Sequence, residues 1–159
     1  MKSGSVYIET TVVSYFSARP SRDIIHLAHQ EITRRWWQHA TRRFDLYISE
    51  LVIEEASAGD SRAAAQRISA IADFPLLALN DDVEHLAIVY MDALTFPPKY
   101  ARDAAHLAVA VAHGIDYLVS WNCAHIANGE IVRKVMKINE REGYSTPIIC
   151  TPEELMPVS

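Results

Sequence analysis

Short apolar runs that do not alternate with polar residues recur along the chain, and each is typical of a strand whose two faces are both buried. The runs are VYI (6–8), LYIS (46–49), PLLAL (75–79), YLVS (117–120) and PIIC (147–150). Strands of this kind belong to parallel sheets, because helices cover both faces of such sheets. The sequence therefore predicts a central, mostly parallel sheet of about five strands.

Longer segments between these runs carry apolar residues at helical spacing. These positions are Ile25, Ala28, Ile32 and Trp36, the segment 63–72, then Val83, Leu86 and Tyr90, and finally Ile131, Val135 and Ile138. A helix is also expected over 101–113, before Gly114, and a short last one from Thr151 onwards. Strands that alternate with helices predict an α/β fold, here a three-layer α/β/α sandwich.

The length of 159 residues fits one domain, which we assign to 1–159. Half of the residues are apolar, as in ordinary globular proteins, and no apolar run approaches the roughly 20 residues that span a membrane. The first residues, MKSGSVYIETT, lack the hydrophobic block of a signal peptide. Two cysteines are too few for a disulfide framework, so we expect a cytoplasmic location.

The formal net charge of −5 argues against a protein that coats nucleic acid non-specifically, but it leaves room for an enzyme that acts on nucleic acid through a metal. The basic residues are unevenly spread, since six of the fifteen fall between Arg19 and Arg43. This segment could contact RNA phosphates. It could also face a protein partner, with Trp36 and Trp37 as anchors, or form a solvated amphipathic helix.

Polar and acidic residues follow several of the predicted strands. Glu9 comes directly after the first strand and Asn122 after the fourth, while Glu54 and Glu55 lie on the helix after the second. Asp103 lies near the start of the helix that follows Pro97 and Pro98. Because sites in parallel sheets form beyond the carboxyl ends of the strands, we expect Glu9, Asp103 and Asn122 to gather at one edge.

Each acid also has a simpler explanation. A glutamate after a strand can be a solvated turn residue, and the helix macrodipole favours an acid in a first turn by about 0.3–1 kcal/mol. Grouped carboxylates, however, repel one another unless a cation lies between them. Oxygen ligands suit Mg²⁺ or Mn²⁺ rather than zinc, and such ions activate water against phosphodiesters. The sequence therefore predicts a metal site at this edge of the sheet, with Glu9 as a ligand and Asp103 and Asn122 close to it.

The ordered set of motifs resembles the PIN-domain ribonucleases, above all the VapC-like toxins of bacterial toxin–antitoxin systems. The motifs are VYIETTVVSYF (6–16), SELVIEEA (49–56), RDAAHLAVA (102–110) and LVSWN (118–122). The similarity extends in the same order and spacing from residue 6 to TPEEL (151–155). It implies the α/β/α fold and an acidic metal site that cleaves RNA.

The resemblance also assigns the site residue by residue. The family's four acids correspond to Glu9, to Glu55 with Glu54 as an alternative, to Asp103 and to Asn122. Aspartate is usual in the family at the positions of Glu9 and Asn122. The family's hydroxyl residues correspond to Thr10 or Thr11 and to Ser120. Asn122 removes one negative charge. Three acids would still neutralise one divalent ion, and a second ion would be held more loosely.

The implied function is a Mg²⁺- or Mn²⁺-dependent endoribonuclease that leaves a 5′-phosphate, is blocked by a cognate antitoxin and forms a homodimer. The alternative is a catalytically weakened or inactive module of the same fold that binds RNA or a protein. A phosphatase with an aspartyl nucleophile fits poorly, because a glutamate at position 9 would misplace the nucleophile.

Three aromatic or basic residues near the acids have open roles. His106 follows Asp103 by three residues on the same helical face, so it could orient that acid, contact substrate or be structural. Trp121 and His125 flank Asn122 and could stack on a base or pack at the edge of the sheet. The sequence leaves these alternatives undecided.

Overall fold

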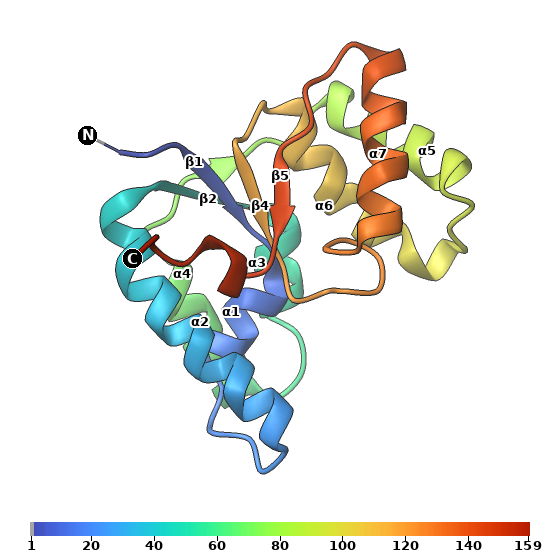
Figure 1. The fold of residues 1–159 in the computed structure, drawn as a ribbon. Coiled ribbons are helices and arrows are strands. Elements are labelled where there is room, and N and C mark those ends of the chain that lie inside the picture. Colours follow the sequence, from blue (N-terminus) through green and yellow to red (C-terminus); the bar gives the residue numbers. More distant parts are fainter. Residues whose placement is uncertain (1) are drawn as a thin grey trace.

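Five strands form one sheet in which every neighbouring pair runs parallel (Figure 1). The structure is a computed structural model that describes residues 2–159. The strands are β1 (Ser5–Ile8), β2 (Asp45–Ser49), β3 (Leu76–Leu77), β4 (Tyr117–Val119) and β5 (Ile148–Cys150), in the spatial order β3-β2-β1-β4-β5. The predicted parallel α/β sheet is confirmed.

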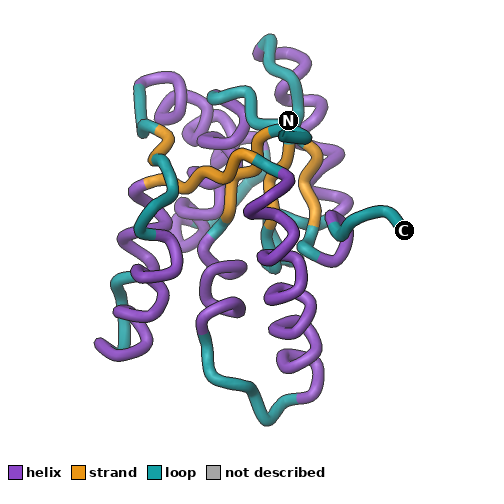
Figure 2. Tube along the Cα trace, turned by 90° about the vertical axis from the view of Figure 1, so that its left-hand side faces the viewer, coloured by secondary structure: helices purple, strands orange, loops and turns teal. Residues whose placement is uncertain are grey.

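Helices cover both faces of this sheet (Figure 2). They are α1 (Thr10–Ser17), α2 (Ile24–Arg43), α3 (Glu50–Ala56), α4 (Ser61–Ile71), α5 (Asp81–Ala93), α6 (Ala101–Ala112) and α7 (Gly129–Glu142), with 3-10 turns η1 (Pro98–Tyr100) and η2 (Glu153–Leu155). Helices α5, α6 and α7 lie on one side, and α1, α2 and α4 on the other (Figure 1). Within residues 2–159, no helix has both the length and the apolar character to cross a membrane.

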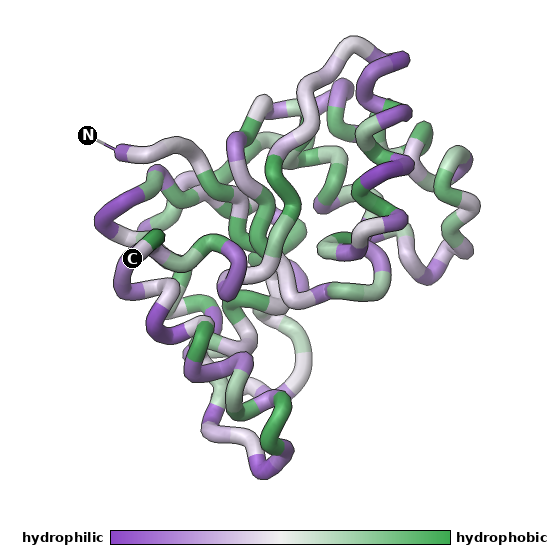
Figure 3. Tube along the Cα trace, viewed as in Figure 1, coloured by the Kyte–Doolittle hydropathy of each residue, from purple (hydrophilic) through white to green (hydrophobic). Residues whose placement is uncertain are grey.

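The core lies between the sheet and these two layers. Strand β1 is buried from Val6 to Ile8, and Figure 3 shows hydrophobic residues gathered along the strands. Helix α6 is buried over most of its length, and its small residues Ala104 and Ala108 let it pack closely against its neighbours. The non-alternating apolar runs in the sequence reflect this burial on both faces.

Two elements are shorter than the sequence predicts. The run 75–79 forms a strand only at Leu76–Leu77, because β3 is an edge strand that pairs with β2 alone. The predicted last helix is a 3-10 turn, Glu153–Leu155. Thr151 and Glu154 bond each other across this turn, since Thr151 N donates to Glu154 Oε1 at 3.0 Å and Glu154 N donates to Thr151 Oγ1 at 3.4 Å.

Helix α2 is present as predicted, but only the second half of its predicted apolar face, up to Trp36, lies toward the core. Ile25 is 64% exposed and Ala28 is also exposed, whereas Gln30, Thr33 and Ala40 are buried. The first turns of α2 project beyond the sheet, at the tip opposite its core-packed end (Figure 1). Apolar spacing alone could not show this, because it says nothing of where a helix extends past its neighbours.

The two neighbouring tryptophans of α2 lie in the core. Trp36 is fully buried, and Trp37 is 7% exposed and stacks on Phe16 with ring centroids 4.1 Å apart. The prediction that they serve as anchors at a protein interface is therefore wrong. They hold α2 against α1 instead.

Strand register brings the residues after β1 and β4 together. Ile8 pairs with Val119, and the backbone N–H of Glu9 donates to the carbonyl of Val119 at 3.1 Å. Glu9 and Ser120 are consequently neighbours at the carboxyl edge of the sheet. The chain builds β2 and β3 on one side of β1 and β4 and β5 on the other, so this edge is a topological switch point, where α/β sheets place their sites.

Two buried tyrosines should make the fold sensitive to alkali. Burial raises the pKa of Tyr7 and of Tyr90 well above a tyrosine's ordinary value, and a hydrogen bond to Ser49 or Asn139 only partly offsets this effect. The contribution of the neutral phenols to the free energy of unfolding is fully present below about pH 10. It is lost as the pH rises further, because the tyrosines ionise at a lower pH in the unfolded chain than in the folded one. We expect the free energy of unfolding to fall by about 1.4 kcal/mol per pH unit for each tyrosine above pH 10.

Urea unfolding at several pH values between 9 and 11.5 measures this slope. The substitution Tyr90→Phe removes one of the two phenols, and it should reduce the slope by about one tyrosine's share. An unchanged slope in this variant would show that Tyr90 does not titrate with unfolding.

Candidate metal site

The carboxylate of Glu9 is held in place at the junction of β1 and α1. Glu9 is the N-cap of α1, and its Oε2 accepts from the N–H of Thr11 at 3.1 Å. Its Oε1 accepts from the hydroxyls of Thr11 and Ser120, each at 2.5 Å, distances typical of hydroxyl bonds to an ionised carboxylate. Only 4% of Glu9 is exposed. The alternative of a solvated turn residue is therefore wrong.

The hydroxyls that hold Glu9 are themselves fixed by the chain after β4. The N–H of Trp121 donates to Thr11 Oγ1 and the N–H of Asn122 donates to Ser120 Oγ, both at 2.9 Å. This arrangement ties the loop after β4 to the start of α1. The acid is consequently oriented from two strands at once, which makes it a preorganised group rather than a mobile one.

Glu55 reaches the same edge from α3. Its Oε1 accepts from Thr10 Oγ1 and lies 2.6 Å from His106 Nε2, and its side chain is 26% exposed. Burial raises the pKa of Glu55, but the hydrogen bond and charge of His106, the Thr10 hydroxyl and the charge of Arg102 outweigh burial and bring it below its ordinary value. Glu55 therefore stays ionised at neutral pH.

Glu54 points away from this cluster. Its side chain is 57% exposed and pairs with Arg102 at 3.0 Å on the surface. The sequence left Glu54 and Glu55 as alternatives because they are neighbours on one helix. The structure brings Glu55 to the edge of the sheet.

His106 connects the cluster to the core. It is 1% exposed, its Nε2 contacts Glu55, and its Nδ1 lies 2.7 Å from the hydroxyl of Tyr7. The Tyr7 hydroxyl in turn lies 2.7 Å from Ser49 Oγ. The ring of His106 is thus fixed on both sides.

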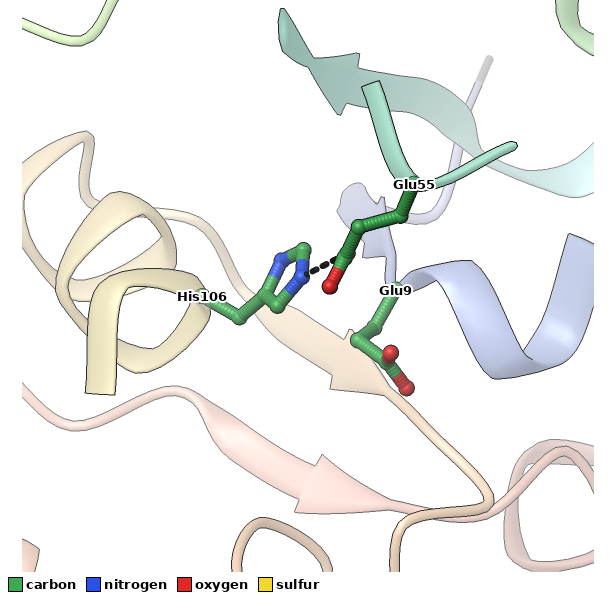
Figure 4. Close-up of side chains that lie close together, drawn as sticks. All are labelled: Glu9, Glu55 and His106. Carbon is green, nitrogen blue, oxygen red and sulfur yellow. Dashed lines mark hydrogen bonds and ion pairs between the residues drawn. The ribbon is translucent and has the colours of Figure 1, made fainter. Parts of the chain in front are cut away.

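Glu9, Glu55 and His106 form a group that can hold a metal ion. One ligand atom from each residue lies within 4.8 Å of the other two (Figure 4). They come from β1–α1, α3 and α6, which are distant in sequence and meet at the switch point of the sheet. Carboxylate and imidazole donors suit a divalent ion such as Mn²⁺, Fe²⁺ or Zn²⁺, and carboxylates also suit Mg²⁺.

Two other predicted ligands, Asp103 and Asn122, lie outside this group of three. Asp103 Oδ2 pairs with His125 Nδ1 at 3.1 Å, and its side chain is 21% exposed. Asn122 Oδ1 accepts from the N–H of His125 at 3.0 Å and so caps the turn after β4. Both residues therefore meet around His125, and a carboxylate at position 103 retains one oxygen that is not engaged with this histidine.

The rings that the sequence offered as base-stacking candidates already pack against protein rings. His125 lies 3.8 Å from Tyr100 between ring centroids, and Trp121 stacks on His29 at 4.1 Å and 12°. The indole N–H of Trp121 donates to Thr33 Oγ1 at 2.8 Å. The sequence could not show these partners because they lie on α2 and η1, far along the chain.

Sequence reasoning did not include His106 among the metal ligands. A signal existed, since His106 lies three residues after Asp103 and one helical turn places both on one face. The sequence could not show that Glu55 lies opposite that face of the helix. The tertiary structure decides it, because it brings the side chain of Glu55 within 2.6 Å of His106 Nε2.

Comparisons with known proteins assign no family to the chain. No model of a known protein family matches it, and no curated protein is significantly similar to it. The likeness to PIN domains therefore remains a resemblance of motifs, and the chemistry has to be argued from the geometry of the site.

Proposed function

We propose that the chain is a metal-dependent endoribonuclease that hydrolyses RNA phosphodiester bonds with Mg²⁺ or Mn²⁺. The observation that carries the proposal is the meeting of Glu9, Glu55 and His106 at the switch point of a parallel sheet. Burying a carboxylate such as Glu9 costs free energy, which three hydrogen-bond donors offset here. An oxygen of a second acid, Glu55, lies within 4.8 Å, and a cation between the two acids would relieve their repulsion.

The residues of the chain have distinct parts in this proposal. Glu9 and Glu55 hold the ion, while Thr11 and Ser120 orient Glu9. Asp103, one turn before His106 on α6, pairs with His125 and is not assigned to the ion. When bound, a divalent ion supplies Lewis-acid activation of water and of the phosphodiester.

A basic hollow close to α1 supports a nucleic acid as the substrate. Arg19, Arg62 and Arg67 line a cavity of about 590 Å³ between the end of α1 and the start of α4. Helix α1 begins beside Glu9 and ends at this hollow, so the proposal assigns the hollow to phosphates of the same RNA whose cleaved bond lies at Glu9. Phosphate contacts of this kind make binding weaker as salt rises.

The remaining parts of the proposal rest on the resemblance to VapC-like toxins. These are a cognate antitoxin that blocks the site, a homodimer, and a cytoplasmic location. Both cysteines are free thiols, with Cys150 buried, which is compatible with a reducing compartment.

Cleavage of single-stranded RNA by the purified chain tests the proposal. We expect cleavage with Mn²⁺ or Mg²⁺, 5′-phosphate ends on the products, and no cleavage after the metal is removed with EDTA. Cleavage that persists in EDTA would contradict a metal-dependent mechanism.

A non-catalytic module is the second candidate, and the position of Asn122 favours it. This residue stands where an acid is expected, and its side-chain oxygen already caps the turn after β4. Saturable RNA binding without cleavage in either metal, under conditions where the chain is folded, would favour the module over the enzyme.

A further inference from the structure

We propose that His106 is a direct metal ligand through Nε2, held by a Ser49–Tyr7 hydroxyl relay, and that its imidazole makes the site prefer Mn²⁺ to Mg²⁺. The inference rests on the proposed metal site but not on RNA as the substrate. The acidic residues alone would form an all-oxygen site, and His106 changes its chemistry.

The contact between His106 and Glu55 has the geometry of a short hydrogen bond, so binding of one ion by both residues requires that the proton leave and the two atoms move slightly apart. Nε2 and Oε1 lie 2.6 Å apart, and both atoms are acceptors unless a proton lies between them. In the metal-free protein, Nε2 therefore carries the proton and donates it to Glu55. A cation bound between the two atoms takes the place of that proton.

The hydroxyls of Tyr7 and Ser49, which lie on the Nδ1 side of the ring, can bond either tautomer of His106. When Nε2 binds a metal, the proton of the neutral ring lies on Nδ1, which then donates to the Tyr7 hydroxyl 2.7 Å away. Tyr7 in turn donates to Ser49 Oγ at 2.7 Å. In the metal-free state both hydroxyls reverse, so that Ser49 donates to Tyr7 and Tyr7 to Nδ1. A neutral ring gains or loses no proton in this exchange, whereas a protonated ring releases the proton of Nε2 to solvent when a metal binds.

An imidazole ligand favours the binding of Mn²⁺ over that of Mg²⁺. Mg²⁺ prefers oxygen ligands and gives up its waters reluctantly. First-row transition ions accept nitrogen readily, and their affinity rises from Mn²⁺ onwards along the series. Outer partners that fix a histidine, as Tyr7 and Ser49 do here, typically contribute 10–100-fold to metal affinity.

EPR of the Mn²⁺-loaded full chain tests the assignment without any RNA. Titration against the signal of free Mn²⁺ measures affinity, with Mg²⁺ as competitor, and we expect Mn²⁺ to bind at least about ten-fold more tightly. Electron spin-echo spectra of the bound ion should show modulation from a directly bound ¹⁴N. This modulation should disappear in His106→Gln and persist in the control His113→Gln, whose histidine bonds the carbonyl of Ala78 instead.

A separate variant tests the part of the Ser49–Tyr7 relay in metal binding. Tyr7→Phe removes the hydroxyl beside Nδ1, so we expect Mn²⁺ affinity to fall by roughly ten-fold while the ¹⁴N modulation stays. If His106→Gln does not fold, the wild-type chain labelled with ¹⁵N-histidine gives the same test. A histidine bound to Mn²⁺ would then show ¹⁵N modulation in place of ¹⁴N modulation.

The outcomes separate this inference from the proposed function. Bound Mn²⁺ without nitrogen modulation overturns the inference, even if RNA is cleaved. Modulation without cleavage supports the inference and contradicts the nuclease. Absence of Mn²⁺ binding at millimolar concentration overturns both.

Discussion

Replacing Glu55 by glutamine should lower metal-dependent RNA cleavage by roughly 100-fold or more, because it removes a charged ligand and a bound ion depends on such ligands. The glutamine side chain keeps the length of the native one and can still bond Thr10 and His106, so the fold should be retained. Single-turnover cleavage of a labelled single-stranded RNA with excess enzyme measures the effect.

Glu54→Gln is the matched control for this experiment. Glu54 is the preceding residue on α3, carries the same charge and pairs with Arg102 on the surface. We expect its substitution to change cleavage by less than about two-fold, since exposed ion pairs contribute little. If the two variants lose activity equally, then Glu55 has no special part in the site.

The second large effect concerns the fold that positions the site. Leu118→Ala should lower the free energy of unfolding by about 2–5 kcal/mol, because Leu118 is fully buried in β4, between β1 and β5. Removal of a buried leucine leaves a cavity that the central strands cannot close. Urea unfolding at neutral pH measures the change as a lower midpoint with an unchanged slope.

Leu76→Ala makes the same chemical change on the edge strand β3. Leu76 is 49% exposed, so its truncation should cost less than about 1 kcal/mol. Similar losses from both variants would contradict the arrangement with β4 inside the sheet and β3 at its edge.

Most of the fold could be predicted from the sequence. The apolar runs predict the parallel sheet because both faces of each strand need cover, and Gly143 ends α7 in the left-handed conformation that glycine adopts most readily (φ 81°). The errors fall where tertiary context replaces local pattern. Helix α2 extends past the sheet and exposes Ile25, and the edge strand β3 shrinks to two residues.

The residues of the candidate site also fall into those that the sequence predicts and those that only the tertiary structure brings in. The sequence by itself places Glu9 at the end of the first strand, because the apolar run 6–8 stops there. The resemblance to PIN domains adds the hydroxyl of Thr10 or Thr11 near this acid and that of Ser120 before Asn122. The meeting of these strand ends at one edge is a consequence of the parallel sheet.

Tertiary structure alone decides which other groups meet Glu9. The packing of α3 and α6 at the carboxyl edge selects Glu55 over Glu54 and brings in His106, while Asp103 turns to His125. Helical spacing defines the face on which a side chain lies, but not the partner that the face meets. That partner depends on how the crossover helices dock on the sheet, and no local pattern encodes this choice.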